Sequence, residues 1–226
     1  MRDWTYGVYL IVTTHFNMTK NWNDIKWIFE PDGLLRDIYV QEVTLLDWEK
    51  LIDFINLNYN LKFGEAESSQ IDKDYVIRYL KDDTGEIESK VLRIYRNGVT
   101  INCHFFLSDQ IEFDVDPKEI KSLQDFENIE NFMISLSKTL HNQVTLTGEN
   151  WPTFPLVKID CDKEINKALT EKEANNLSEN QNSILKQLSL LKTDFKMRFF
   201  PKAFGKQILK SANKEYVSTK KNKNVW

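Results

Sequence analysis

The sequence predicts an α+β fold: a mainly antiparallel sheet with two principal packed helices, plus a helical C-terminal extension. Three observations predict it. Short runs of β-branched and aromatic residues are separated by turn signals, of which Asn97-Gly98 is the strongest hairpin signal. Two longer stretches, residues 44–59 and 122–141, repeat apolar residues at helical spacing. From residue 163 onward the chain becomes polar and then strongly basic.

The first part of the chain predicts strands followed by a helix. Residues 6–16 (YGVYLIVTTHF) are β-branched and aromatic, which favours a strand. KWIFE and LLRDIYV flank Pro31-Asp32-Gly33, and these turn residues predict a hairpin. The helix over residues 44–59 then begins at a capping box formed by Thr44 and Asp47. We expect that helix to pack on the sheet.

A meander and a second helix are expected next. The segments predicted as strands are DYVIRYL (74–80), SKVLRIYR (89–96), VTINCHFFL (99–107) and IEFDVD (111–116). The helix over residues 122–141 follows, with the buried stripe Phe126, Ile129, Phe132, Met133, Leu136 and Leu140. A strand at QVTLT and an irregular, proline-limited segment complete the body, which we expect to span residues 1–162.

Residues 163–226 are expected to form a helical, basic C-terminal extension. Thr170 and Glu173 form a capping box ahead of a long polar helix. Residues 186–226 carry a net charge of +9 and residues 1–185 carry −13. The basic stripe of this extension consists of lysines that recur every four residues: Lys202, Lys206, Lys210 and Lys214. Two interpretations of this charge asymmetry stay open. Either both charged surfaces are simply solvated, or each of them binds a different partner.

The sequence contains no catalytic signature. Cys103 and His104 are neighbours on a predicted strand, so their side chains point to opposite faces and cannot form a dyad. Two Cys and three scattered His do not match zinc spacing, and the seven Gly form no phosphate-binding loop. We therefore expect no enzyme activity, no catalytic residues and no cofactor. An enzyme that uses scattered carboxylates is the third hypothesis.

Acidic residues are the candidates for binding. IEFDVD places three carboxylates on one predicted strand face, where they form a solvated or charge-guarded edge rather than a metal site. Further carboxylates flank the predicted hairpin and form an acidic rim that suits a basic protein, with an aromatic anchor beside it. The expected partner-binding residues are Glu30, Asp32, Glu112, Asp114, Asp116 and Trp151.

WIFEPDGLLRDIYV followed by LLDWEKLIDFINLNY, and later NFMISLSKTLHNQVTLTGENWPTFPLVKI, resembles the immunity proteins encoded beside bacterial polymorphic toxins. The resemblance covers about residues 20–160 and includes no diagnostic motif. It implies a non-catalytic protein that binds a cognate toxin tightly and blocks its active site, and it assigns no functional residue. A basic nuclease is a toxin that an acidic inhibitor surface would suit.

The first hypothesis is therefore an immunity-type protein that occludes a toxin through an acidic surface. The alternative is an adaptor that binds nucleic acid or an anionic membrane through its basic C-terminal helix. The same helix also has the charge to dock on the acidic body of its own chain. The N-terminus lacks a signal pattern and no early apolar run can span a bilayer, so we expect a cytoplasmic protein without a transmembrane segment.

Overall fold

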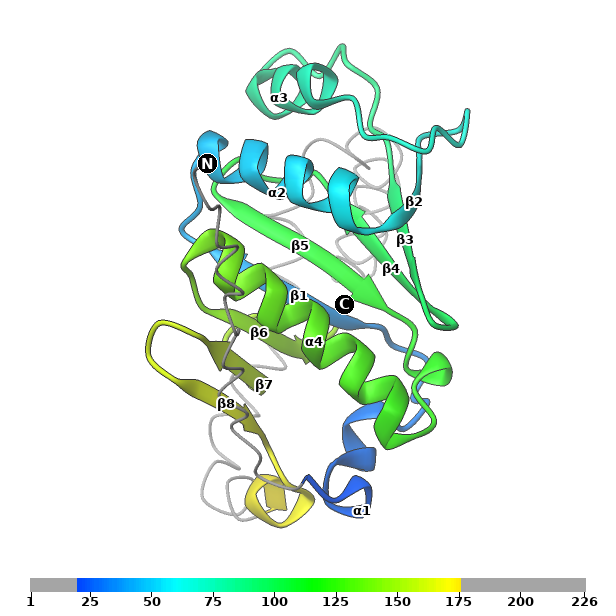
Figure 1. Ribbon diagram of the computed structural model, residues 1–226, viewed down its shortest axis with the longest axis vertical. Helices are drawn as coiled ribbons and strands as arrows, with labels where there is room; N and C mark the ends of the chain where they lie inside the picture. Colours follow the sequence, from blue (N-terminus) through cyan, green and yellow to red (C-terminus); the bar gives the residue numbers. More distant parts are fainter. Residues whose placement is uncertain (1–19, 176–226) are drawn as a thin grey trace, which may run out of the picture.

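The computed structural model describes residues 20–175, which build one eight-stranded antiparallel sheet with helices packed on it (Figure 1). The strand order is β2-β3-β4-β5-β1-β6-β7-β8. This confirms the predicted α+β class. The elements, in chain order, are α1 (Trp22–Ile25), η1 (Lys26–Phe29), β1 (Arg36–Gln41), α2 (Leu45–Asn58), β2 (Asn60–Phe63), α3 (Lys73–Lys81), β3 (Leu92–Arg96), β4 (Val99–His104), β5 (Gln110–Val115), η2 (Pro117–Glu119), α4 (Leu123–Leu140), β6 (Val144–Gly148), β7 (Pro155–Asp160) and β8 (Ile165–Ala168).

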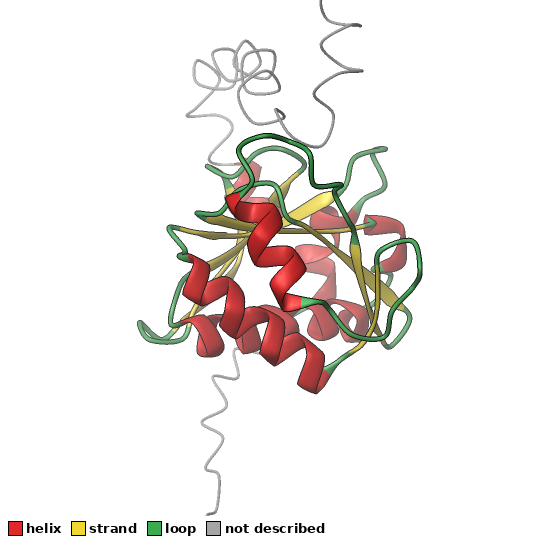
Figure 2. Cartoon of the chain, turned by 90° about the horizontal axis from the view of Figure 1, so that it is seen from above, coloured by secondary structure: helices red, strands yellow, loops and turns green. Residues whose placement is uncertain are grey.

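The two long helices cover one face of the sheet, and Figure 2 shows them on one side of the strands. On that face the central strands β1 and β5 place Ile38 opposite Phe113. The Phe113 ring meets the Phe132 ring of α4 edge-on, with 5.2 Å between centroids. All three side chains are fully buried. Alternate residues of each strand therefore form the core, and the residues between them face away from α2 and α4.

Both long helices lie where the sequence predicts them. Thr44 and Asp47 form the expected capping box at the start of α2. Helix α4 begins at the cap Ser122, ends at His141 in the left-handed conformation, and buries every residue of its predicted stripe. The Asn97-Gly98 hairpin between β3 and β4 is also confirmed, since both residues have positive φ (49° and 87°) as a two-residue turn of this type requires.

The predicted hairpin around Pro31-Asp32-Gly33 is wrong. KWIFE forms the 3-10 helix η1 rather than a strand, because Ile25, Ile28 and Phe29 have helical spacing and all three are buried. The turn itself is present, with Gly33 at a φ of 83° and the Leu34 N–H donating to the Asp32 carboxylate. The segment is thus a helix-to-strand connection that ends in β1.

A second predicted strand is also a helix. DYVIRYL lies in α3, which begins at the cap Asp72, whose carboxylate accepts the N–H of Tyr75. Val76, Tyr79 and Leu80 are buried and lie at helical spacing. Their burial favours a helix over the strand that the alternation of apolar and polar residues predicted.

The sheet continues past residue 162, where we expected the body to end. β7 and β8 pair through Asp160 and Ile165, and β8 extends to Ala168. The Thr170–Glu173 capping box then forms as predicted, with 2.9 Å between the Thr170 nitrogen and the Glu173 carboxylate. The predicted strand over residues 6–16 and most of the C-terminal extension lie outside the described residues. Among residues 20–175, no helix is both long enough and apolar enough to cross a bilayer.

A buried arginine fixes the connection between η1 and β1. Arg36 is 5% exposed and its guanidinium donates to the carbonyl oxygens of Ile28 and Glu30 at 2.5 and 3.0 Å. It also donates to both oxygens of the Asp32 carboxylate, at 3.1 and 3.2 Å. One planar cation therefore satisfies carbonyls that the irregular backbone would otherwise leave unpaired.

We predict that Arg36→Lys destabilises the fold, because an ammonium group cannot reproduce the fork of donors that reaches three sites at once. The expected loss is about 2 kcal/mol of unfolding free energy, the usual scale for charged hydrogen bonds. Urea denaturation measures it. The matched control is Arg78→Lys at an exposed position of α3, which should change the midpoint little. Equal midpoints for the two variants would contradict the assigned role of Arg36.

Candidate functional site: a carboxylate cluster on the outer face of the sheet

We name the face of the sheet turned away from α2 and α4 the outer face. The strand register aligns its side chains in two rows that cross the sheet. The first row contains Lys62, Arg93, Asn102, Asp114, Asp37 and Thr147. The second row contains His104, Glu112, Tyr39, Thr145, Lys158 and Lys167.

The carboxylates of these rows gather on the two central strands. Asp37 of β1 lies directly opposite Asp114 of β5, and Glu112 is two residues from Asp114 on the same face. We call Asp37, Glu112 and Asp114 the carboxylate cluster. Side chains directly opposite one another in antiparallel strands have Cβ atoms about 4.5–5.5 Å apart, where like charges destabilise the pairing. In both rows the Lys and Arg residues lie on strands farther out, namely β2, β3, β7 and β8.

Uncharged donors hold two of the three carboxylates. Asp37 accepts the Tyr39 hydroxyl at 2.8 Å and the Asn150 N–H at 2.6 Å. Asp114 accepts the Asn102 side-chain amide at 2.7 Å. Because these donors carry no net charge, they fix the carboxylates in place without cancelling their charge.

His104 is the remaining partner of Asp114. Its Nε2 lies 2.5 Å from an Asp114 oxygen, and its ring stacks on Phe106 with 4.9 Å between ring centroids. The stacking and the hydrogen bond together fix the orientation of the imidazole at the border of the cluster. Among residues 20–175, His104 is the one basic side chain whose hydrogen bond to these carboxylates the structure records.

Burial and mutual repulsion perturb the acidity of the cluster. Burial, with the Asp37 charge as a second cause, raises the pKa of Glu112 from 4.5 to about 7. Burial also raises the pKa of Asp37 from 3.8 to about 6, although the Asn150 and Tyr39 hydrogen bonds oppose that change. The pKa of Tyr39 is raised as well, by burial and then by the Asp37 charge. The protonated, neutral forms of Glu112, Asp37 and Tyr39 are favoured because a further negative charge is costly in this environment.

The loop from Gly148 to Phe154 borders the cluster. Its Asn150 is in the left-handed conformation, at a φ of 57°, which directs the N–H of that residue to Asp37. Glu149 accepts the Leu35 N–H at 3.2 Å and so adds a fourth carboxylate beside β1. Trp151 is partly buried and stacks on Phe154, with 5.3 Å between ring centroids.

The structure separates the expected partner-binding residues by accessibility. Glu112 and Trp151 are partly exposed, so a partner can reach them. Asp114 is only 6% exposed and is held by Asn102 and His104. Asp114 therefore offers little surface for the direct contact with a partner that we expected from the sequence.

Asp116 does not share the strand face of Glu112 and Asp114, which corrects the predicted row of three carboxylates. β5 ends at Val115, and Asp116 caps η2 by accepting the Lys118 N–H at 2.9 Å. Glu30 and Asp32 are exposed in the connection before β1, where Asp32 pairs with Arg36. Glu30, Asp32 and Asp116 are thus close to β1 or β5 in sequence, but they do not belong to the row of side chains on the outer face.

No group of three or more His, Cys, Asp or Glu residues among residues 20–175 is arranged to hold a metal ion. Cys103 and His104 lie on opposite faces as predicted, because Cys103 is fully buried in the core and His104 belongs to the outer face. Burial raises the pKa of the Cys103 thiol, which disfavours the reactive thiolate.

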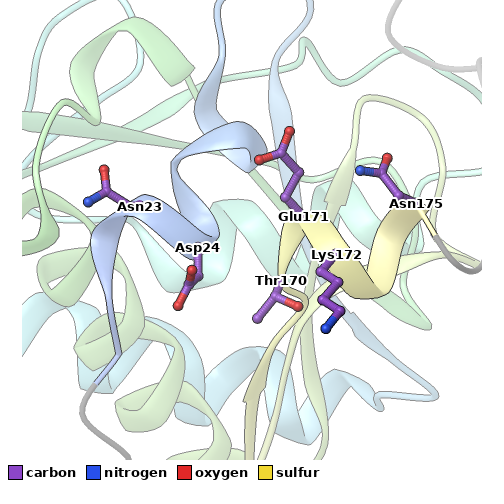
Figure 3. Close-up of a pocket in the computed structure, with 6 residues that line it drawn as sticks. All are labelled: Asn23, Asp24, Thr170, Glu171, Lys172 and Asn175. Atoms are coloured by element: carbon purple, nitrogen blue, oxygen red, sulfur yellow. The ribbon is translucent and has the colours of Figure 1, made fainter.

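An open pocket of about 480 Å³ lies between α1 and the last described residues (Figure 3). Its lining is polar and carries both signs of charge: Asn23, Asp24, Thr170, Glu171, Lys172 and Asn175. No residue of the carboxylate cluster lines it. The pocket combines two carboxylates and one ammonium group with no buried titratable group, so its chemistry resembles an ordinary solvated surface.

Sequence reasoning placed Asp37 among the carboxylates of the acidic rim but did not link it to Glu112 or Asp114, and it missed Tyr39, Asn102 and His104 as members of this site. DIYV alternates polar and apolar residues, which signals that Asp37 and Tyr39 share a face. Their neighbours Asn102 and Asp114 belong to other strands, however, and only the register brings them together. The basic stripe from Lys202 to Lys214 lies outside the described residues.

Searches against protein-family models, curated proteins and solved structures give no match for this chain.

We predict that Glu112→Gln stabilises the fold relative to the unchanged chain, and that this gain in unfolding free energy is larger at pH 8 than at pH 5. Glu112 faces Asp37, Tyr39, Asp114 and His104, and its raised pKa means that the folded state holds its proton more tightly. That contribution to stability is full below pH 4.5 and is lost as pH rises through about 7. The neutral amide of Gln cannot ionise and so avoids this loss, which should raise the unfolding free energy at pH 8 by about 2 kcal/mol.

Chemical denaturation at both pH values tests this expectation. The control is Glu65→Gln, the same substitution at an exposed residue in the loop after β2, and the Glu112→Gln effect is compared with it at each pH. A Glu112→Gln difference that is the same at pH 5 and pH 8 would show that Glu112 titrates normally.

Proposed function

We propose that this chain is a non-catalytic binding protein of the immunity type, which neutralises a cognate basic toxin by covering it with the outer face of the sheet. The carboxylate cluster is the observation that carries the proposal. Its three acidic side chains lie side by side on the central strands, where they raise the electrostatic free energy of the fold. Residues that oppose stability in this way are expected where binding requires them.

The charge of the body supports a basic partner. Residues 20–175 contain 30 Asp and Glu against 18 Lys and Arg, which leaves a net charge of −12. A field of this sign steers a cationic protein toward the surface and raises the association rate, with little dependence on the details of contact. A basic nuclease has the surface charge that such a field attracts.

The arrangement on the outer face supports a specific contact rather than general attraction. A Lys or Arg of the partner that reaches Glu112 also approaches the charges of Asp37 and Asp114. Burial, and after it the neighbouring negative charges, raise the pKa values of Asp37 and Glu112. A nearby cation would favour the ionised forms, so binding and ionisation of the cluster support each other. Trp151, in the loop that follows Gly148, is partly exposed and supplies an aromatic side chain of the kind that anchors interfaces.

The absence of a metal-ready group among residues 20–175 and the buried Cys103 favour binding over catalysis. Tyr39 and Asp37 are also buried, so Glu112 is the member of the cluster that a partner would contact directly. Inhibition by occlusion requires only a complementary surface, and the outer face supplies one with a defined centre of negative charge.

We expect this protein to rescue growth in a protection assay. The toxin candidate is the C-terminal domain encoded by the adjacent upstream gene, expressed in a sensitive host alone and together with the full chain. The domain alone should stop growth, and co-expression should restore it through a complex that survives gel filtration. Toxicity without rescue, or rescue without a complex, would refute occlusion as the mechanism.

A further inference from the structure

We propose that the basic C-terminal segment, residues 186–226, folds back onto the outer face and covers the carboxylate cluster while no partner is bound. The inference deepens the proposed function, because the segment would occupy the surface assigned there to the toxin. It can also be tested without any toxin. The occupant is thus a part of this chain, and the contact regulates access to the cluster.

Charge complementarity is the first argument. The segment carries +9 and residues 20–175 carry −12, so the two parts of one chain attract each other strongly. The basic stripe of four lysines repeats every four residues, which places the four on one side of any helix that the segment forms. The carboxylate cluster concentrates acidic groups on two adjacent strands, and its partly exposed member Glu112 is the one that the lysines can contact.

The distribution of cations on the outer face is the second argument. Lys62 of the first row pairs with Glu67 at 2.7 Å, and Lys167 of the second row pairs with Glu173 at 2.8 Å. These two lysines are therefore compensated at the edges of the sheet, where they oppose an incoming cation little. The other two cations of the rows, Arg93 and Lys158, lie one strand nearer the cluster, on β3 and β7. The centre of the face holds the carboxylates that have only His104 and uncharged donors as partners in the described structure. A cationic segment gains most by crossing that centre.

The length of the chain is the third argument. β8 and β5 are four strand spacings apart in the sheet order, which is about 19 Å at the usual distance between strands. The described chain ends at Asn175, shortly after β8, and ten residues separate it from Lys186. Ten extended residues reach about 35 Å. The segment can therefore reach β1 and β5 without any change in the described fold.

The effective concentration of a tethered segment makes this contact favourable even if its intrinsic affinity is low. Because the contact is electrostatic, it weakens as salt screens it. A toxin with a higher charge or a better fit would displace the segment, and the displaced lysines would not then compete. The outer face is in this way protected from weak, non-specific cations while it remains open to the cognate partner.

Zero-length carbodiimide cross-linking of the full chain at low ionic strength, read out by mass spectrometry, tests the contact. We expect links within one chain between lysines of residues 186–226 and Glu112 or Glu149. These links should fall at least about fivefold in ~0.5 M salt, where the Debye length is only a few ångströms. Links confined to other surfaces, links only between two chains, or no links would overturn the proposal.

Limited trypsin digestion of variants supplies the second measurement. In Glu112→Gln/Glu149→Gln, cleavage within residues 186–226 should become several-fold faster, because the lysines lose their acidic partners. The matched control is Glu65→Gln/Glu86→Gln, which removes the same charge from exposed loops and should cleave as the unchanged chain does. Equal rates in all three chains would overturn the proposal even if the cross-links form.

Two further probes separate this contact from other roles of the segment. If the full chain binds duplex DNA or phosphatidylserine vesicles at low salt and forms no internal links, the segment serves those ligands and the proposal fails. Internal links without growth rescue would retain the contact and refute the toxin partner. Growth rescue without internal links would support the toxin partner and refute the contact of the segment with the outer face.

Discussion

The pairing of β1 with β5 is the constraint on which both faces of this protein depend. One register places Ile38 against Phe113 under the helices and Asp37 against Asp114 on the outer face. A slip of one residue would move the carboxylates into the core and the apolar side chains out of it. The burial of the apolar face therefore fixes the carboxylate cluster as firmly as it fixes the core, and the fold holds like charges together that would otherwise separate.

Under the proposed function, this arrangement would suit the outer face to a cationic partner. The uncharged donors Tyr39, Asn102 and Asn150 orient Asp37 and Asp114 without adding a positive charge. A cation that arrives from outside thus meets a preorganised site and relieves existing repulsion, which is a favourable combination for fast and selective association. Whether the cation belongs to a toxin or to the C-terminal segment, the same residues would recognise it.

The sequence predicted those elements whose signals are local. The capping box at Thr44, the buried stripe of α4 and the Asn97-Gly98 turn each depend on residues a few positions apart, and all three are confirmed. DYVIRYL and KWIFE were misassigned because short segments satisfy strand and helix patterns at once, and packing decides between them. Glu112 was identified as a candidate, but its link to Asp37 and His104 depends on pairings across the sheet, which no local pattern encodes.

The association rate constant between the full chain and the toxin domain it rescues tests the central claim most directly. The comparison is between Glu112→Gln/Glu149→Gln and Glu65→Gln/Glu86→Gln, measured by stopped flow over a range of ionic strength. At pH 8, above the raised pKa of Glu112, both variants lose nearly the same charge, so general attraction predicts equal rates. If the outer face is the binding surface, the first variant should associate about tenfold more slowly at low salt and the second should match the unchanged chain. Equal rates for the two variants would place the contact on another surface.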